Sequence, residues 1–469
     1  MISTAMLLFS ACIDGYKDDQ TFSSDVRGET LESPKVEDVV FKPSPDGGRL
    51  TVQWPVVHGA GGYQFSLYIV DDPENPVIVG NENEVVDGCS VDRTLKDDTK
   101  YKVVIKTLGN DKYDNKDAIT TTETAYSTLV PTYATIPQGD IAEWFADNPI
   151  PSDKEKEELA YVLEANGNYT LSAPIDFGKQ KVTFRGEKIG HAKLTYGSAG
   201  RICTTAGLKI KFIDFDCNAV GGSSSDGALL LFSSKPDETL IGLNNHYIIK
   251  DPVVIQSCHI TGIQRHLVYD NKKKYCPATL MINDCVVKLA TTQEQPVIYF
   301  NQGFANDMTV QNSTFWHDGP KNNNYFVQYN GSARPDRAGF VSGSVNYLNS
   351  TFYHVCYNKQ WGNYNSFAGQ TSVNWNMKQN IFLESGKGEV ARRFLGGRTG
   401  QVTASFGQNT YWYGGVVPVE ELKYDISGTH FTADPELKDP TNGDFTVLGT
   451  EQLTARTGDP RWLPILVEE

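Results

Sequence analysis

The sequence predicts an all-β protein in two parts, a small β-sandwich followed by a right-handed parallel β-helix. The 42 Gly, 22 Pro and 23 Tyr among 469 residues favour strands and turns over helices. Apolar and polar residues alternate in the first part, and a short strand pattern recurs at long intervals in the second. A chain of this length holds two or three domains. We expect a signal and tether over 1–33, the sandwich over 34–131 and the β-helix over 132–469.

The segment 34–131 has the alternation of half-buried strands at 50–54 and 63–70, with a glycine-rich turn between them. Trp54 is expected to be its central core aromatic. Leu95, a polar turn and Tyr101 before an alternating strand form the pattern of a tyrosine corner. The segment resembles a fibronectin type III or related immunoglobulin-like module, and the resemblance implies a spacer role.

The β-helix is predicted from a repeat of two or three strand residues, a small polar residue and an apolar residue. Polar residues stand at positions 257, 284, 312, 349, 380 and 409, which are 27 to 37 residues apart. This spacing fits one rung of a coil whose equivalent side chains stack on one another. Asn312 and Asn349 should occupy equivalent bends, because Asn tolerates a left-handed backbone. Phe315 and Phe352 should then stack inside, as should the thiols of the successive rungs at 258 and 285.

A short amphipathic helix is expected at 139–147, directly before the first rung. Asp140 is its predicted N-cap, since a carboxylate there accepts from the free N–H groups of the first turn. The open end of a β-helix exposes unpaired strand edges, so such a helix would cover the first rung.

Cys12 is preceded by a short apolar run ending in Ser10 and Ala11, and Lys17, Asp18 and Asp19 follow it. The run is too short to span a bilayer, which takes about 20 residues. The pattern resembles a bacterial lipoprotein signal with the acidic export signal of Bacteroidetes. The resemblance implies lipidation of Cys12 and an outer-membrane location facing the cell exterior.

The early turn at 182–186 and the closing stretches at 434–447 and 458–462 resemble those of pectate-lyase-like β-helices. Together with the lipoprotein signal and the fibronectin-like module, they resemble an outer-surface lipoprotein of a Bacteroidetes polysaccharide-utilisation system. The resemblance implies a polysaccharide or oligosaccharide ligand, attachment to the outer membrane through a lipid, and an outer-membrane glycan transporter as a candidate partner.

The charge and the cysteines exclude some classes of function. A net charge of −15 argues against nucleic acid as a partner. Seven cysteines remain beyond Cys12 at irregular spacings and without a CxxC pair, which favours buried thiols over a disulfide framework or a zinc site. We assign no metal ligand and no cofactor.

A polysaccharide lyase is the alternative to a binding protein. The Asn-Thr-Asp, Gly-His-Gly and Arg-Ile-Lys motifs of polygalacturonases are absent, as is the Trp-Ile-Asp-His motif of the main pectate lyase family. A lyase needs a base and often calcium, which requires several acidic oxygens. Asp214 and Asp216 share a strand face but are few for such a site. Arg265, His266 and Lys274 are the candidate catalytic residues of a lyase.

The stretch 315–375 is the richest in aromatic residues and Asn, and the wide rung spacing within it implies an inserted loop. Aromatic faces stack on sugar rings, and Arg pairs bind carboxylates in a fork. The predicted glycan-binding residues, expected to face solvent, are Trp316, Tyr325, Trp361, Arg334 and Arg337.

The sequence therefore favours a cell-surface glycan-binding lipoprotein that captures a polysaccharide, such as a pectic or other uronate-containing glycan. The alternatives are a polysaccharide lyase acting by β-elimination and a structural or adhesin-like surface protein. Calcium is expected only if the protein is a lyase.

Overall fold

The computed structural model describes residues 26–44, 47–221, 226–291, 294–319, 322–398 and 402–465. The chain divides into two compact units between Leu129 and Val130, close to the boundary expected from the sequence. Both units are built from strands, so the predicted all-β class is confirmed. Within the described ranges, no helix combines the length and the apolar character needed to cross a membrane.

The first unit is a sandwich of two antiparallel sheets. One sheet contains β1 (Val40–Pro43), β2 (Arg49–Gln53) and β6 (Ser90–Thr94). The other contains β4 (Val77–Ile78), β3 (Gly62–Ile69), β7 (Lys100–Leu108) and β8 (Thr122–Ser127), with β5 (Glu84–Val86) paired to β3. Their inner faces share one core, as half-buried strands require.

The two aromatic residues singled out in the sandwich take their predicted places. Trp54 is buried, and its ring stacks on Phe65 at a centroid distance of 5.9 Å. Tyr101 is buried too, and its hydroxyl accepts from the backbone N–H of Lys96 at 2.6 Å, which is the predicted tyrosine corner. The resemblance of this unit to fibronectin type III modules stays a prediction.

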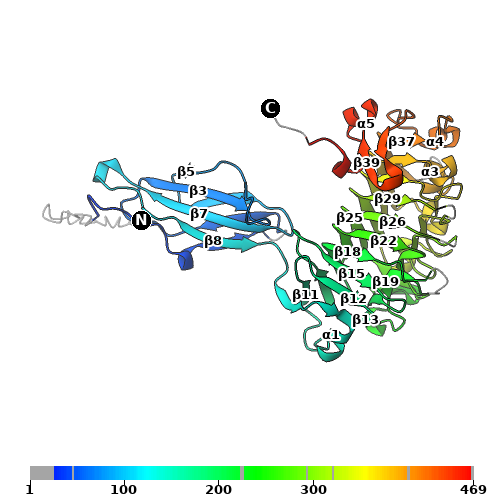
Figure 1. Ribbon diagram of the computed structural model, residues 1–469, viewed down its shortest axis with the longest axis horizontal. Coiled ribbons are helices and arrows are strands. Elements are labelled where there is room, and N and C mark those ends of the chain that lie inside the picture. Colours follow the sequence, from blue (N-terminus) through cyan, green and yellow to red (C-terminus); the bar gives the residue numbers. More distant parts are fainter. Residues whose placement is uncertain are drawn as a thin grey trace, which may run out of the picture. The chain divides into compact units, whose positions relative to one another are not determined.

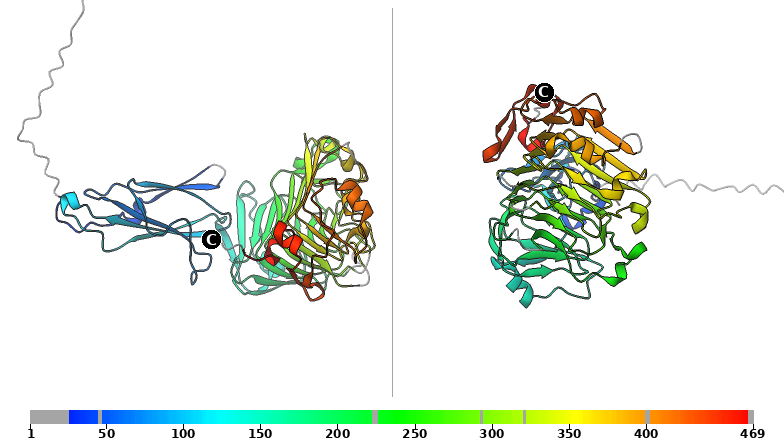
Figure 2. Two further views of the ribbon diagram at one scale, coloured as in Figure 1. Left: turned by 90° about the horizontal axis from the view of Figure 1, so that it is seen from above. Right: turned by 90° about the vertical axis from the view of Figure 1, so that its right-hand side faces the viewer.

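The second unit is a right-handed parallel β-helix of three long sheets, which we call sheets I, II and III (Figures 1 and 2). Sheet I contains β9 (Thr132–Ile136), β11 (Glu158–Leu163), β14 (Lys181–Arg185), β17 (Leu208–Lys211), β21 (Val253–Gln256), β25 (Thr279–Asn283), β28 (Asp307–Gln311), β31 (Gly343–Leu348), β34 (Val373–Lys378) and β36 (Thr403–Gly407). Sheet II contains β10 (Gly139–Asp140), β12 (Asn168–Leu171), β15 (Ala192–Tyr196), β18 (Ile213–Asp216), β22 (His259–Ile263), β26 (Val286–Leu289), β29 (Thr314–His317), β32 (Thr351–Tyr353), β35 (Ile381–Leu383) and β37 (Thr410–Trp412). Sheet III contains β13 (Pro174–Asp176), β16 (Arg201–Thr204), β19 (Ala228–Phe232), β23 (His266–Tyr269), β27 (Ile298–Tyr299), β30 (Val327–Gln328) and β33 (Gly362–Asn363). From β11 to β33 the chain visits the sheets in the order I, II, III on each of seven rungs, with the handedness that parallel crossovers prefer. In the described residues, the first rung and the last two have strands in sheets I and II alone.

The bends between sheets I and II show the predicted repeat. Asn312 and Asn349 both have left-handed backbones, with φ of 50° and 47°, and strand register places them on adjacent rungs. On the last two rungs the left-handed residues are Gln379 and Gln408, so the predicted polar positions 380 and 409 are off by one. The reason is that Asn380 and Asn409 belong to a buried ladder inside the coil, where the Asn380 side chain donates to Asn409 Oδ1 at 3.0 Å.

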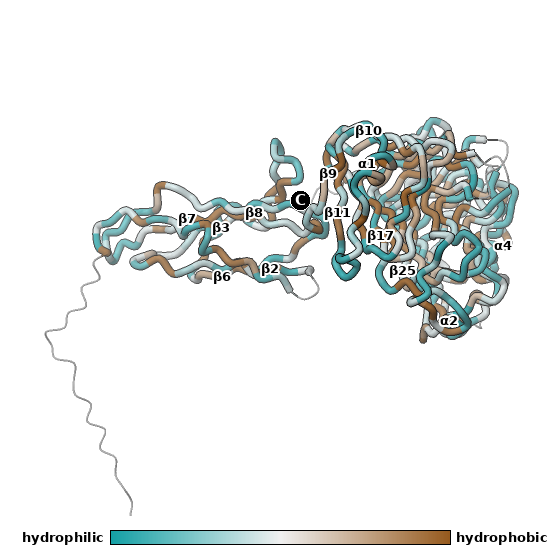
Figure 3. Tube along the Cα trace, turned by 90° about the horizontal axis from the view of Figure 1, so that it is seen from below, coloured by the Kyte–Doolittle hydropathy of each residue, from teal (hydrophilic) through white to brown (hydrophobic). Residues whose placement is uncertain are grey.

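The interior of the coil is a column of stacked side chains. The rings of Phe315, Phe352, Phe382 and Tyr411 stack in succession at centroid distances of 5.7, 5.1 and 5.7 Å. The predicted stacking of Phe315 on Phe352 is thus confirmed, and the thiols at 258 and 285 are buried and free as expected. In Figure 3 hydrophobic residues run along strands such as β17 and β25, which matches a core made of alternate strand residues.

In the described part of this unit, five short α-helices accompany the coil. They are α1 (Ile141–Asp147), α2 (Pro335–Ala338), α3 (Val390–Phe394), α4 (Val419–Tyr424) and α5 (Thr450–Ala455). The predicted helix at 139–147 is α1, and Asp140 Oδ1 accepts from the N–H groups of Ala142 and Glu143. Phe145 of α1 packs edge-on against Tyr161 of the first full rung at 5.0 Å, so the helix covers that end of the core.

The C-terminal segment returns to the coil and covers part of sheet II. It contains the hairpin β38 (Leu437–Asp439) and β39 (Asp444–Val447), α5 and the 3-10 helix η8 (Pro460–Trp462). Figure 1 shows β39 and α5 near β29 and β37. Phe445 and Leu463 share a buried cluster with Trp316 and Tyr353, which point outward from sheet II. We call residues 434–465 the C-terminal cover.

Candidate functional site

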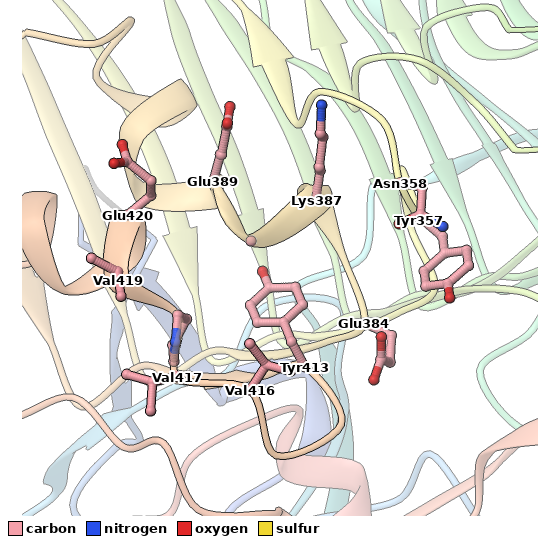
Figure 4. A pocket seen from close by; sticks show the side chains of 12 residues that line it. Tyr357, Asn358, Glu384, Lys387, Glu389, Tyr413, Val416, Val417, Val419 and Glu420 are labelled. Carbon is pink, nitrogen blue, oxygen red and sulfur yellow. The ribbon is translucent and has the colours of Figure 1, made fainter.

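A pocket of about 380 Å³ opens where three successive strands of sheet II end. This volume lies within the range of small-molecule sites. Its lining residues are Tyr357, Asn358, Glu384, Lys387, Gly388, Glu389, Tyr413, Val416, Val417, Pro418, Val419 and Glu420. Figure 4 shows the Tyr413 ring in the middle of this lining, with Glu384 and Tyr357 to one side of it.

The rungs of the coil place these residues beside one another. Glu384 follows β35 directly, and its backbone N–H donates to Trp412 O at the end of β37, just before Tyr413. One rung earlier, the turn after β32 begins at His354 and leads to Tyr357. Because equivalent positions on consecutive rungs are one strand spacing apart, residues far apart in sequence line one opening.

The lining loops turn through left-handed residues, as other bends of the coil do. Asn358, Glu384 and Lys387 have φ of 55°, 49° and 58°, in the left-handed region that favours glycine. Left-handed residues turn the chain sharply at the end of a strand. Here they direct polar side chains of two turns toward the same opening.

The rear of the pocket is held by a buried carboxyl group. Glu421 Oε1 accepts from the backbone N–H of Val390, and Oε2 accepts from that of Ala391, which ties α4 to α3. The Tyr413 hydroxyl donates to the same Glu421 Oε1 at 3.0 Å. Burial raises the pKa of Glu421 to about 7. This network fixes the Tyr413 ring in place, so one wall of the pocket is rigid.

The mouth of the pocket exposes apolar surface. The side chain of Tyr357 is 41% exposed and that of Val416 is 70% exposed, and Val417 and Val419 are also exposed. Exposed aromatic and aliphatic side chains that gather around a hollow are typical of binding sites. The wall offers flat apolar contact without burying the residues in the core.

The polar side of the pocket combines three acidic groups with one lysine. Burial raises the pKa of Glu384 above its usual value. Glu389 pairs with Arg392 and Arg393, with N–O distances of 3.2 Å to each. The exposed Lys387 side chain adds a donor at the rim. The pocket can therefore accept and donate hydrogen bonds around an apolar wall.

The structure contradicts two of the predicted binding residues. Trp361 is 0% exposed and stacks on Phe326 at 5.0 Å inside the coil, because the wide rung folds its aromatic residues inward. Trp316 does point out of sheet II, but Phe445 of the C-terminal cover packs against it and buries it. The prediction that these two rings face solvent is wrong.

The other three predicted binding residues lie elsewhere than the pocket lining. Tyr325 is half-buried before β30 with φ of 71°. Arg334 and Arg337 flank the start and the last turn of α2. The Arg334 guanidinium forms a fork with Asp336, with both N–O distances at 3.0 Å, so its fork geometry is satisfied within the chain. Arg337 is exposed.

The candidate lyase residues do not gather around a common opening. Arg265 Nε donates to His266 Nε2 at 3.1 Å, and His266 Nδ1 donates to Pro296 O. Burial lowers the pKa of His266 to about 3, so the ring is neutral and both of its nitrogens are engaged. Lys274 lies beyond the far end of β23, and its Nζ donates to Asn244 O. This arrangement does not present a base to a substrate.

Two features were missed from the sequence. Tyr357 falls within the aromatic stretch 315–375, whereas Glu384, Lys387 and Tyr413 lie outside it. The apolar run at 416–419 after two glycines is the sequence signal that could have indicated this pocket. The structure also brings His191, Asp214 and His259 together on sheet II, where a metal ion could bind. Cys12, the predicted lipidation site, lies outside the described residues.

Comparisons with known proteins match parts of the chain to domain families whose function is unknown. Three family models match, each a domain of unknown function: DUF4992 over residues 1–166, DUF4957 over 167–318 and DUF5123 over 345–462. No curated protein matches the sequence.

Among solved structures, the chain is similar to the PL6 family alginate lyase AlyGC, with a TM-score of 0.35 and 12% identity over 61% of this chain. It covers 41% of AlyGC, less than half of that protein. It is also similar to pectate lyase PelI from Erwinia chrysanthemi, with a TM-score of 0.20 and 9% identity over 69% of this chain and 84% of PelI. At these TM-scores and sequence identities, the similarity concerns the β-helix fold alone and assigns no role to any residue.

Proposed function

We propose that this protein binds carbohydrate in the pocket formed by the turns after β32, β35 and β37. The observation that carries the proposal is the pairing of an exposed aromatic and aliphatic wall with polar side chains on the same opening. Sugars have the same two-sided chemistry, since their C–H faces are apolar and their hydroxyls form hydrogen bonds.

The individual side chains suit this ligand. Tyr357 offers a ring face for stacking against a sugar, and such aromatic contacts contribute about 0.5–1.5 kcal/mol beyond the area they bury. The Glu384 carboxyl group accepts hydrogen bonds from hydroxyls, and the Asn358 amide both donates and accepts. Tyr413 is held from behind and forms a fixed floor, so little ordering is needed on binding.

The charges of the pocket favour a neutral sugar unit over a uronate. Three carboxyl groups, on Glu384, Glu389 and Glu420, face one lysine, Lys387. The Arg392 guanidinium lies near both Glu389 and Glu420, which offsets part of this negative charge. An added uronate carboxylate would still meet the Glu384 side chain. The pectic ligand expected from the sequence would therefore bind here through its neutral units.

The test is binding of purified protein to a panel of neutral and uronate-containing polysaccharides by affinity electrophoresis, followed by calorimetry with oligosaccharides. Tyr357→Ala and Glu384→Gln should each weaken binding about three- to tenfold. Tyr133→Ala is the matched control, because Tyr133 is similarly exposed on the same unit and lies outside the pocket. Equal affinity of all three variants and the wild type would place the sugar elsewhere.

Cleavage is a distinct outcome of the same experiment. Each polysaccharide is also incubated with protein and assayed for unsaturated uronate products. We expect none, since Arg265, His266 and Lys274 do not form an accessible base. Release of unsaturated oligosaccharides that is abolished by Arg265→Ala would instead support the lyase.

We further propose that the protein acts at the outer face of the outer membrane, anchored by a lipid on Cys12 and delivering glycan to a transporter. The apolar run before Cys12 and the acidic residues after it support this location. Cys12→Ala should abolish incorporation of labelled fatty acid and release the protein from the membrane fraction. Whole-cell protease treatment that spares the wild-type protein would contradict surface exposure.

A further inference from the structure

Three side chains converge on the outer face of sheet II, away from the residues that line the sugar pocket. Asp214 lies in β18, and strand register places it beside His259 of β22. His191 directly precedes β15, the strand on the other side of β18. Two neighbouring strands and the residue just before a third thus contribute one polar group each.

The distances between their polar atoms suit a shared ion. His191 Nδ1 lies 2.9 Å and His259 Nδ1 lies 3.5 Å from Asp214 Oδ1. One ligand atom from each residue lies within 4.8 Å of the other two. Ligands bound tetrahedrally at about 2.0–2.1 Å from a zinc ion are roughly 3.3 Å apart, so small rotations of the two imidazoles would complete the geometry.

The cluster is supported on one side and open on the other. The His191 ring lies 6.1 Å from the Phe212 ring and 5.8 Å from that of His259, so its orientation is restricted. Side-chain exposures of 20% for His191, 33% for Asp214 and 55% for His259 leave the outer side accessible to solvent. An open position beside three protein ligands is the arrangement of metal sites that also bind a water molecule.

The neighbouring charged groups are engaged with other partners or can move away. Arg461 donates to Asp284 at 2.5 Å, and Asp284 also accepts from Ser257, so these two opposite charges beside His259 are paired with each other. Asp216 accepts from the Asn218 backbone and side chain. Lys193, the register neighbour of Asp214 in β15, is exposed and can extend into water.

The ligand types decide which metal fits. Two imidazoles and one carboxylate match zinc and the related divalent transition metals. Calcium prefers six to eight oxygen ligands, and this cluster offers one carboxylate. We propose that His191, Asp214 and His259 bind one divalent transition metal ion of the zinc class, with the solvent-facing position open to water.

The test uses the full chain, stripped with a chelator and titrated with Zn²⁺ by calorimetry. The wild type should bind one ion per chain. Asp214→Asn and His259→Gln each remove one ligand and should weaken binding by about 100-fold or more, since loss of an outer partner alone costs about 10–100-fold. His58→Ala, at an exposed histidine of the sandwich, and Lys193→Ala, which keeps all three ligands, should bind as well as the wild type.

Co²⁺ supplies a second readout that does not depend on stability. The wild type loaded with Co²⁺ should show the visible absorption of a four-coordinate ion, and the two ligand variants should lack it. Circular dichroism of the metal-free variants shows that they are folded. No binding of Zn²⁺ by the wild type, unchanged affinity in both ligand variants, or loss of binding in Lys193→Ala would overturn the proposal.

Discussion

The two halves of sheet II carry different surfaces on the same outer face. In the half formed by β15, β18 and β22, the outward side chains include Lys193, Asp214 and His259, and they meet solvent. In the half formed by β29, β32, β35 and β37, the outward positions include Trp316 and Tyr353, and the C-terminal cover buries them. One sheet therefore serves as an open polar surface at one end and as an internal interface at the other.

The contrast shows that an aromatic side chain that points out of a β-helix need not be exposed to solvent. Its strand position decides only that it leaves the coil, and a later segment of the chain decides whether it meets water. Trp316 meets Phe445, which is more than a hundred residues further along the sequence. The side chain of His259, on the same outer face, stays 55% exposed, so it is available to a ligand.

The largest loss of stability is expected from removing a buried ring between the C-terminal cover and sheet II. Phe445 is fully buried between Trp316 and Trp462, at ring distances of 5.8 and 5.6 Å. Phe445→Ala should lower the free energy of unfolding by about 3–5 kcal/mol, because a buried aromatic side chain leaves a cavity. Chemical denaturation followed by Trp fluorescence measures this loss. A loss below about 1 kcal/mol would mean that the C-terminal cover contributes little to the stability of the coil.

A second prediction concerns the pH dependence of the covered half. Asp459 belongs to the C-terminal cover and is buried against sheet II, and desolvation raises its pKa to about 6 in the folded protein. The unfolded carboxyl group releases its proton near 3.8, so between these values the folded state binds more protons and stability falls as pH rises. The contribution is about 3 kcal/mol across this window.

The matched variant for this prediction is Asp459→Asn, which keeps the shape of the side chain without its charge. Stability measured from pH 4 to pH 7 should fall less steeply in this variant than in the wild type. Parallel curves for the two proteins would show that the Asp459 carboxyl group is ionised throughout this range.

A smaller loss is expected where one hydroxyl joins the cover to the sheet. Thr314 Oγ1 donates to Asp459 Oδ2 at 2.7 Å and accepts from Trp462 Nε1 at 2.8 Å. Thr314→Val keeps the size of the side chain but leaves both partners without this hydroxyl, at a cost of about 1–3 kcal/mol. Denaturation of Thr314→Ser, which retains the hydroxyl, serves as the control and should stay closer to the wild type.

The repeat in the sequence was enough to predict the coil. Asn312 and Asn349 mark equivalent bends because a left-handed bend restricts the residue types that fit it. The same reasoning failed on the last rungs, since Asn380 and Asn409 are buried ladder residues one position further on. An Asn at a bend and an Asn inside the coil have the same appearance in sequence, and only strand register separates them.

The candidate sites were less accessible to sequence reasoning for a related reason. The sugar pocket combines Tyr357, Glu384 and Tyr413, which come together only when the length of each rung is known. The histidine cluster depends on the pairing of β18 with β22, across a long connection that obscures the repeat. The solvent exposure predicted for Trp316 failed because aromatic content does not reveal which segment will cover it.

The smallest effect on stability is expected in the open half. His259 lies on the outer face with a side chain that is 55% exposed, and its ring contacts Asp214 and His191 rather than the core. In chelator-treated protein, His259→Ala should change the free energy of unfolding by no more than about 0.5 kcal/mol, as for most surface positions. Denaturation beside Phe445→Ala under the same conditions measures the difference between the two halves. If both substitutions lowered stability equally, His259 would be a structural residue, and the open half would be as much a part of the packed protein as the covered one.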